Sequence, residues 1–421
     1  MISAAFSHIL LALIVAISIL LMLIRPRNIP EVYWVGGGAI LLIVLRLIPL
    51  KLAGKAAAEG SDVYLFLIGM MLLSELGRRE GLFDWIAVLA VNHSKGSPRR
   101  LFLLVYLVGV VVTTFLSNDA AAVVLTPAVF AAAKKANTKP LPLLFVCAFI
   151  ANAASFVLPI SNPATLVLYA NHTPALDLWV ARFAAPSVLS IVVTFFMLRW
   201  TQRRDLQGEC ASGLPVDRLS ANGKVALAGI GVTAIALLVV SALDLQLGLP
   251  TAVLGILTTL VVLVKERRSP VELIGGISWS VLPLVAGLFV LVEMLAHTGV
   301  IAQLSRLLAQ ATQQSQLATA AASGLVVALG SNAINNLPAG LIASATALQA
   351  HSPERIVDAM LVGVDLGPNL SITGSLATIL WLLSIRREGE EVGFMQFCRI
   401  GMVVMLPALV LAMGARLLTG H

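Results

Sequence analysis

Apolar runs of about twenty residues alternate with short polar loops along most of the chain, and a helix of that length crosses the hydrocarbon core of a bilayer. The pattern therefore predicts membrane-spanning helices near residues 5–24, 32–50, 61–77, 180–199, 224–243, 249–264, 280–296 and 395–418. Two shorter amphipathic segments, 81–92 and 300–312, predict helices that lie in the membrane interface.

Polar strings interrupt two of the remaining apolar segments. Ser117-Asn118-Asp119 lies in the middle of segment 100–135, and Ser331-Asn332 lies in the middle of segment 317–350. Each segment predicts a re-entrant hairpin with the polar string at its tip. Backbone that stops being helical at membrane depth exposes unpaired N–H and C=O groups, which is tolerable only where it lines a cavity or a site.

Two further apolar segments follow the hairpins and are also interrupted. Segment 141–170 contains Pro159 and Pro163, and segment 356–385 contains Pro368 and Gly374. Proline and glycine break helices, so both segments predict broken spans. Broken segments at matching places in two halves of a chain are the best sequence pointer to the substrate site of a transporter.

The two halves of the chain repeat the same plan, with residues 1–200 as the first repeat, 201–223 as a cytoplasmic linker and 224–421 as the second repeat. Residues that match at fixed offsets are Gly69, Glu75 and Gly81 with Gly287, Glu293 and Gly299, and Asn152 and Thr165 with Asp365 and Thr378. An odd number of crossings inserts the second repeat upside down. We therefore predict an all-α polytopic membrane protein with two inverted repeats of five spans, each with a re-entrant hairpin and a broken helix.

Composition and charge agree with this interpretation. The chain is 59% hydrophobic and 12% charged, against about 25% charged in soluble domains. The net charge of +7 comes from lysines and arginines in short loops, which indicates the positive-inside rule and argues against a nucleic-acid partner. Most of these residues lie on the cytoplasmic side if both termini are outside the cytoplasm. We therefore predict a multi-pass protein of the cell (inner) membrane, with membrane lipid around it.

The interrupted segments resemble those of the arsenical pump family, the arsenite and antimonite efflux antiporters. The string from Ser117 to Pro127 resembles the first hairpin of that family, and the string from Ser331 to Pro338 resembles its second hairpin. Asp365-Leu366-Gly367-Pro368-Asn369, followed by Gly374-Ser375-Leu376-Ala377-Thr378, resembles its second broken helix. The last motif is the most specific, because the hairpin motifs are shared with the wider ion transporter superfamily.

This resemblance runs over nearly the whole chain and implies a secondary transporter that exports arsenite and antimonite from the cytoplasm in exchange for protons. It implies no cofactor and no bound metal, since the metalloid is the substrate. A cytoplasmic ATPase remains an open partner, because the chain itself contains no Walker motif. One departure is Asn152-Ala153, where relatives carry an acid in the first broken helix, so a coupling carboxylate cannot be transferred to that position.

The substrate that the resemblance implies is a small uncharged trihydroxide at neutral pH, which needs hydroxyl, amide and backbone partners. The interrupted segments offer such groups and contain no lysine or arginine at the breaks. The predicted substrate-binding residues are Ser117, Asn118, Asn152, Ser161, Asn162, Thr165, Ser331, Asn332, Asn335, Asn336, Asn369, Ser371, Thr373 and Ser375. Membrane asparagine and serine also join helices by hydrogen bonds, which is the alternative for any one of them.

Asp119 and Asp365 are the acids at these breaks and the predicted proton-coupling residues. An ionised carboxylate is costly inside a membrane, which suits a group that takes up and releases a proton. The alternative for each is a fixed hydrogen-bond acceptor at the start of a half-helix. Glu75 and Glu293 lie toward span ends, where a structural or interfacial role is favoured.

Other classes of function remain to be weighed. A sodium/proton antiporter or a silicate exporter of the same superfamily would show similar hairpins. An intramembrane enzyme is disfavoured, because the chain has no His-Glu-x-x-His motif and no Gly-x-Gly before Asp365. The three cysteines, Cys147, Cys210 and Cys398, have no spacing typical of a disulfide framework or a metal site.

Overall fold

The fold is described from a computed structural model that places residues 4–24, 26–169, 173–216, 218–266 and 269–419. Every regular element within these ranges is a helix. Among the described residues, six helices are long and apolar enough to cross a membrane, and there are up to eight such spans when each of two bent helix pairs is counted as one. The prediction of an all-α polytopic membrane protein is therefore confirmed.

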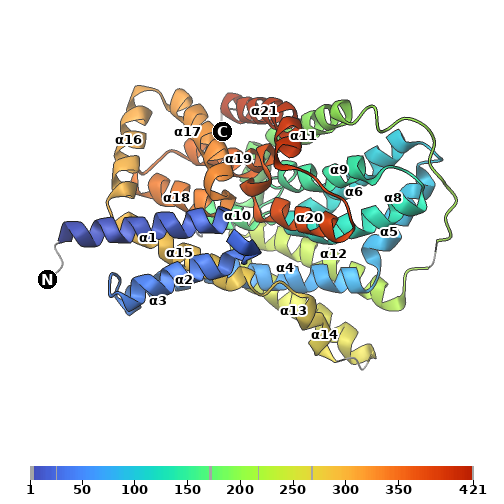
Figure 1. Cartoon of the computed structure of the whole chain (residues 1–421), viewed down its shortest axis with the longest axis horizontal. Coiled ribbons are helices and arrows are strands. Elements are labelled where there is room, and N and C mark those ends of the chain that lie inside the picture. Colours follow the sequence, from blue (N-terminus) through green and yellow to red (C-terminus); the bar gives the residue numbers. More distant parts are fainter. Residues whose placement is uncertain (1–3, 25, 170–172, 217, 267–268, 420–421) are drawn as a thin grey trace.

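The two halves contain matching series of helices (Figure 1). The first half consists of α1 (Ala4–Ile24), α2 (Glu31–Val44), α3 (Leu50–Glu59), α4 (Ser61–Arg79), α5 (Leu82–His93), α6 (Pro98–Phe115), α7 (Asn118–Ala120), α8 (Thr126–Lys135), α9 (Pro140–Ala153), α10 (Pro163–Tyr169) and α11 (Leu176–Thr201). The second half consists of α12 (Ala221–Ala242), α13 (Gly248–Glu266), α14 (Pro270–Gly276), α15 (Val281–His297), α16 (Val300–Gln314), α17 (Gln316–Ile334), α18 (Asn336–Gln349), α19 (Glu354–Leu366), α20 (Leu376–Arg387) and α21 (Phe394–Leu418).

Bends and turns recur at equivalent places in the two series. Helices α3 and α4 meet at 50°, and their counterparts α14 and α15 meet at 45°. The matching glycines Gly81 and Gly299 precede α5 and α16 with φ of 71° and 82°. This left-handed backbone region favours glycine, which explains why the sequence repeats that residue there.

The matching glycines Gly69 and Gly287 lie where helices cross closely. A Cβ on Gly69 of α4 would meet the Thr251 carbonyl oxygen of α13 at 2.2 Å, and a Cβ on Gly287 of α15 would meet Val35 Cγ1 of α2 at 2.7 Å. Small residues let membrane helices approach in this way. Each repeat therefore packs a bent helix against the second helix of the other repeat, and Figure 1 shows α4 and α13 side by side.

The second predicted span needs correction, and the helix that follows it was not predicted. The predicted span 32–50 ends as α2 at Val44, because Pro49 disfavours helical backbone at the residue before it and the chain turns at Arg46, whose φ is 54°. Residues 50–59 then form the separate helix α3. Its counterpart α14 was also not predicted, because both are short and only moderately apolar.

The second hairpin also turns later than predicted. Ser331 and Asn332 remain inside α17, where the Ser331 hydroxyl donates to the Val327 carbonyl oxygen at 2.8 Å. The helix ends at Asn335, whose φ is 72° and whose Oδ1 accepts from the Leu337 backbone N–H at 3.3 Å. Asparagine tolerates positive φ and caps helices, so it combines both roles at the tip. Segment 100–135 contains α6, α7 and α8, segment 141–170 is interrupted between α9 and α10, and segment 356–385 is interrupted between α19 and α20; Ala170 is outside the described residues.

Candidate functional site

The tip of the first hairpin is bound to the break in the first broken span. Ser117 Oγ accepts from the Ala120 backbone N–H at 3.3 Å and so caps α7. The Asn118 backbone N–H donates to the Ser161 carbonyl oxygen at 3.0 Å, and the Ser161 hydroxyl donates to the Thr114 carbonyl oxygen at 3.0 Å. These bonds satisfy backbone groups that the interruption of the helices leaves open.

The second hairpin is bound to the second break through two asparagines, Asn332 of α17 and Asn335 at the tip, whose Nδ2 donates to the Thr373 carbonyl oxygen at 3.5 Å. Asn332 Nδ2 donates to the Gly367 carbonyl oxygen at 2.9 Å, and Asn332 Oδ1 accepts from the Ser371 hydroxyl at 2.7 Å. The Thr373 hydroxyl donates to the Asn332 carbonyl oxygen at 3.1 Å. Asn332 therefore joins α17 to the irregular segment between α19 and α20.

The two broken spans are also bound to each other. Asn152 Nδ2 donates to Asn369 Oδ1 at 3.0 Å and to Thr378 Oγ1 at 3.3 Å. Asn162 Nδ2 donates to Asp365 Oδ1 at 2.6 Å. These residues are almost completely buried, so the half-helices of the two repeats share one polar interior.

A cavity of about 20 Å³ lies where the four interrupted segments meet. Both hairpin tips and both breaks contribute to its wall, together with one residue from each of α4 and α15. The lining residues are Leu67, Asn118, Asp119, Asn162, Pro163, Val281, Asn336, Leu337, Ser375, Leu376 and Ala377. Amides, a hydroxyl and a carboxylate thus face a space that the two repeats form together.

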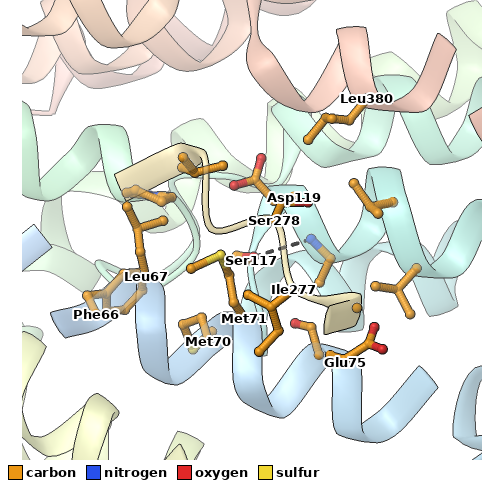
Figure 2. A pocket seen from close by; sticks show the side chains of 17 residues that line it. Phe66, Leu67, Met70, Met71, Glu75, Ser117, Asp119, Ile277, Ser278 and Leu380 are labelled. Atoms are coloured by element: carbon orange, nitrogen blue, oxygen red, sulfur yellow. Dashed lines mark hydrogen bonds between the residues drawn. The ribbon is translucent and has the colours of Figure 1, made fainter. Parts of the chain in front are cut away.

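A second cavity of about 80 Å³ adjoins the first and shares Asp119 with it. Figure 2 shows Ser117 and Asp119 at this cavity, with Met70, Met71 and Glu75 from α4 and Ser278 from the loop before α15. Neither lysine nor arginine is among the lining residues of the two cavities. The space therefore runs from the hairpin tip toward the end of α4 that carries Arg78 and Arg79.

The two predicted coupling acids have different surroundings. The Asp119 side chain accepts no hydrogen bond from a described residue and faces both cavities, while Ser117 supplies the cap at the start of α7. Asp365 is fully buried, and its Oδ2 has no hydrogen-bond partner among the described residues. The Asp119 side chain therefore lines open space, whereas the Asp365 side chain is enclosed by protein and bonded to Asn162.

The predicted substrate-binding residues divide into two groups. Those that line the cavities are Ser117, Asn118, Asn162, Asn336 and Ser375. Those that hold the interrupted backbone or lie behind the wall are Asn152, Ser161, Thr165, Ser331, Asn332, Asn335, Asn369, Ser371 and Thr373. The side chains of the second group hydrogen-bond to the protein itself, except Thr165, whose buried hydroxyl has no partner among the described residues.

Sequence reasoning missed the apolar part of the wall. Leu67 and Val281 from the two bent helices line both cavities, and Met70 and Met71 line the larger one. The only sequence signal was the repetition of Gly69 and its neighbours 218 positions later. Glu75, for which a structural role was expected, lines the larger cavity and receives hydrogen bonds of 2.7 Å from Arg78 and Arg79.

The known proteins to which the chain is similar are described as transporters or membrane pumps. A family model described as a citrate transporter matches residues 1–363. The chain is 27% identical over 360 residues to the arsenical pump membrane proteins of Yersinia enterocolitica and Escherichia coli strain K12, covering 83% of this chain and 84% of each relative. An uncharacterized transporter of Mycobacterium tuberculosis is 27% identical over 371 residues, with the same coverage.

A solved structure shares the fold. The YdaH transporter of Alcanivorax borkumensis, whose structure is described as having an unusual topology, superposes with a TM-score of 0.56 and covers 89% of this chain and 88% of its own. Its sequence identity of 16% means that this similarity concerns the fold alone.

Proposed function

We propose, from the premise that the chain belongs to the citrate transporter family, that it is a secondary active transporter that exports arsenite and antimonite from the cytoplasm in exchange for protons. The observation that carries the proposal is the small cavity enclosed by both hairpin tips and both breaks, lined by amides, a hydroxyl and one carboxylate. The arsenical pump relatives support the choice of substrate.

The chemistry of the wall favours a small uncharged hydroxide. Asn118, Asn162, Asn336 and Ser375 can donate to and accept from hydroxyl groups. An anion with several carboxylates, such as citrate, would need basic residues or bound cations, and the cavity walls contain no lysine or arginine. The site therefore suits arsenite better than citrate, the substrate in the description of the family.

The proposed exchange uses Asp119 and Asp365 as the groups that carry protons. Asp119 faces the cavities, so the same space holds the substrate and a group that can release a proton. Asp365 accepts a hydrogen bond from Asn162, and Asn162 and Pro163 line the smaller cavity. Binding of the hydroxide and protonation of these acids then compete for one polar region, which is the physical requirement for exchange.

The experiment is uptake into everted membrane vesicles of a strain without its own arsenite exporter. An imposed proton gradient, acidic inside, should drive accumulation of arsenite or antimonite without added sodium, and excess citrate should not compete. Uptake driven by sodium alone would assign the chain to sodium-coupled carriers of the superfamily. Competition by silicic acid without arsenite accumulation would favour a silicate exporter.

Localisation in the inner membrane with both termini outside the cytoplasm belongs to the same proposal. It is supported by the span pattern and by the position of Arg78 and Arg79 at the end of α4. A cysteine introduced near either terminus, in a chain whose three native cysteines are serines, should react with an impermeant maleimide in intact spheroplasts. A partner ATPase is not required for this exchange, and purified protein in liposomes without ATP should transport.

A further inference from the structure

Helices α10 and α19 lie side by side and are joined by two hydrogen bonds of the same kind. At one end, Asn162 Nδ2 donates to Asp365 Oδ1 at 2.6 Å; at the other, the Tyr169 hydroxyl donates to Asp358 Oδ1 at 2.5 Å. Asn162, which immediately precedes α10, and Tyr169 are seven positions apart, as are Asp358 and Asp365 on α19; seven helical residues span two turns or about 10 Å. The two bonds therefore form antiparallel rungs on one face of each helix.

The outer rung is anchored by a buried cluster of charges. Asp358 Oδ2 accepts from Arg416 Nε at 2.8 Å and from Arg416 Nη2 at 2.5 Å, and Arg182 Nη1 lies 3.8 Å from the same oxygen. Arg182 also donates to Glu354, whose side chain is mostly exposed. Asp358 and Arg416 are fully buried, so α19 is held by α11 and α21 at this point.

We propose that Tyr169 and Asp358 are positioning residues for the coupling carboxyl Asp365. The charge cluster fixes Asp358, Asp358 fixes the end of α10 through Tyr169, and α10 in turn holds Asn162 against Asp365. The inference deepens the proposed function, because it rests on Asp365 as a proton carrier. It adds residues that lie two turns from that carrier and outside both cavities.

The physical reason is the rigidity of a short helix with two fixed ends. Helix α10 has seven residues, and its first residue follows Asn162 while its last is Tyr169. Loss of the Tyr169 bond frees one end, so the amide of Asn162 spends less time within hydrogen-bond distance of Asp365. A donor stabilises the ionised carboxylate more than the neutral acid. Weakening it should therefore move protonation of Asp365 to higher pH.

The test compares Tyr169→Phe with Tyr106→Phe. Both tyrosines are buried and each donates one short hydrogen bond, but the Tyr106 hydroxyl bonds the Ile191 carbonyl oxygen on a helix that carries neither acid. The readout is infrared titration of the protein in liposomes, in which the Asp365 carboxyl absorption is the band that Asp365→Asn removes. Proton-driven arsenite uptake is measured in the same preparations as a function of pH.

We expect Tyr169→Phe to shift the midpoint of the Asp365 band to higher pH, by about threefold in proton concentration. This shift is smaller than complete loss of the Asn162–Asp365 hydrogen bond would give, because the bond is weakened and not removed. The pH of half-maximal uptake should move with it, while Tyr106→Phe keeps both midpoints. Equal midpoints in wild type and Tyr169→Phe would overturn the inference, as would an equal shift in Tyr106→Phe. If Tyr169→Phe does not fold, Arg182→Lys, which keeps the charge but loosens the anchor, should give a smaller shift of the same sign.

The two proposals fail in distinguishable ways. A wild-type protein that titrates at Asp365 but accumulates no arsenite would refute the proposed substrate and leave the infrared comparison valid. A wild-type protein that accumulates arsenite with unchanged midpoints in Tyr169→Phe would refute the positioning role alone.

Discussion

Replacement of Asp365 by asparagine is the perturbation that bears most directly on proton coupling. The new side chain can keep its oxygen toward Asn162 Nδ2, which donates to Asp365 Oδ1 at 2.6 Å. Its nitrogen then takes the place of Oδ2, which has no partner among the described residues. A buried donor without an acceptor costs about 1–3 kcal/mol, so Asp365→Asn should lower the melting temperature but leave a folded protein.

The size of the transport effect follows from the driving force. One proton crossing a pH difference of one unit contributes about 1.4 kcal/mol, which is a tenfold accumulation of substrate. Wild-type protein in liposomes with the membrane potential held at zero should therefore approach tenfold arsenite accumulation for one coupled proton. Asp365→Asn mimics the protonated state permanently, so accumulation should fall to about onefold. Exchange of labelled for unlabelled arsenite should persist within about threefold of wild type.

Asp119→Asn separates a carrier from a structural acid at the other break. Ser117 already caps α7, and no described residue donates to the Asp119 side chain, so asparagine should fold without penalty. Accumulation should fall only if Asp119 shares the proton load. The control is Asp205→Asn, which removes the exposed partner of Lys139 in the linker and should leave accumulation unchanged.

Retention of tenfold accumulation by Asp365→Asn would refute the reasoning, provided that the variant is folded and inserted. Glu75 would then be the next acid to test, since it lines the larger cavity beside Asp119. Loss of both accumulation and exchange in a folded Asp365→Asn protein would instead show that the carboxylate is needed for substrate binding.

Three further predictions concern single features of the structure. Replacement of all three cysteines by serine should retain arsenite accumulation within about twofold, because no described cluster of Cys, His, Asp or Glu could hold a soft ion; complete loss in a folded protein would point to thiol ligands. Gly276→Ala should reduce transport at least tenfold, because its Cβ would lie 2.0 Å from Glu75 Oε1, whereas Gly275→Ala meets nothing within 4 Å and should transport normally. Asn332→Ala should lower the free energy of unfolding by about 2–4 kcal/mol in chemical denaturation, because the Gly367 carbonyl oxygen and the Ser371 hydroxyl lose their hydrogen bonds to the Asn332 side chain; a change below 1 kcal/mol would contradict the role assigned to Asn332.

Much of this architecture could be predicted from the sequence, because the bilayer limits which backbone conformations a membrane-embedded segment can adopt. Long apolar runs must be helices, and polar interruptions must line a site, so the first hairpin, both broken spans and the match of the two halves followed directly. The cavity residues Asn118, Asn162 and Ser375 were found for the same reason. A polar residue beside a break at that depth either lines the cavity, as these three do, or bonds to the interrupted backbone, as Ser161 and Asn332 do.

The remaining features depend on packing that periodicity does not encode. Ser331 and Asn332 look like a second copy of Ser117-Asn118, yet the backbone stays helical there, because Asn335 provides the positive φ and the cap instead. Arg182 lies within the predicted span 180–199, and the hydrophobic pattern gives no sign that it is buried beside Asp358. Hydropathy assigns an arginine to a side of the membrane and says nothing of an acid contributed by another helix.

The pseudo-symmetry of the two repeats is broken at Asp365, the residue for which we propose proton coupling. Asn152 and Asp365 are equivalent positions, and so are Thr165 and Thr378; Asn152 Nδ2 donates to Thr378 Oγ1 at 3.3 Å. Symmetry pairs Asp365 with Thr165 in the same way, yet the Thr165 hydroxyl and Asp365 Oδ2 are both buried without a partner among the described residues. Asn152 and Thr378 stay neutral and keep their hydrogen bond at every pH, although Asn152 Oδ1 also has no partner among the described residues, whereas the acid in the other half changes charge with its proton. A carrier built from inverted repeats needs such a difference, because identical halves would give its two orientations the same response to protons.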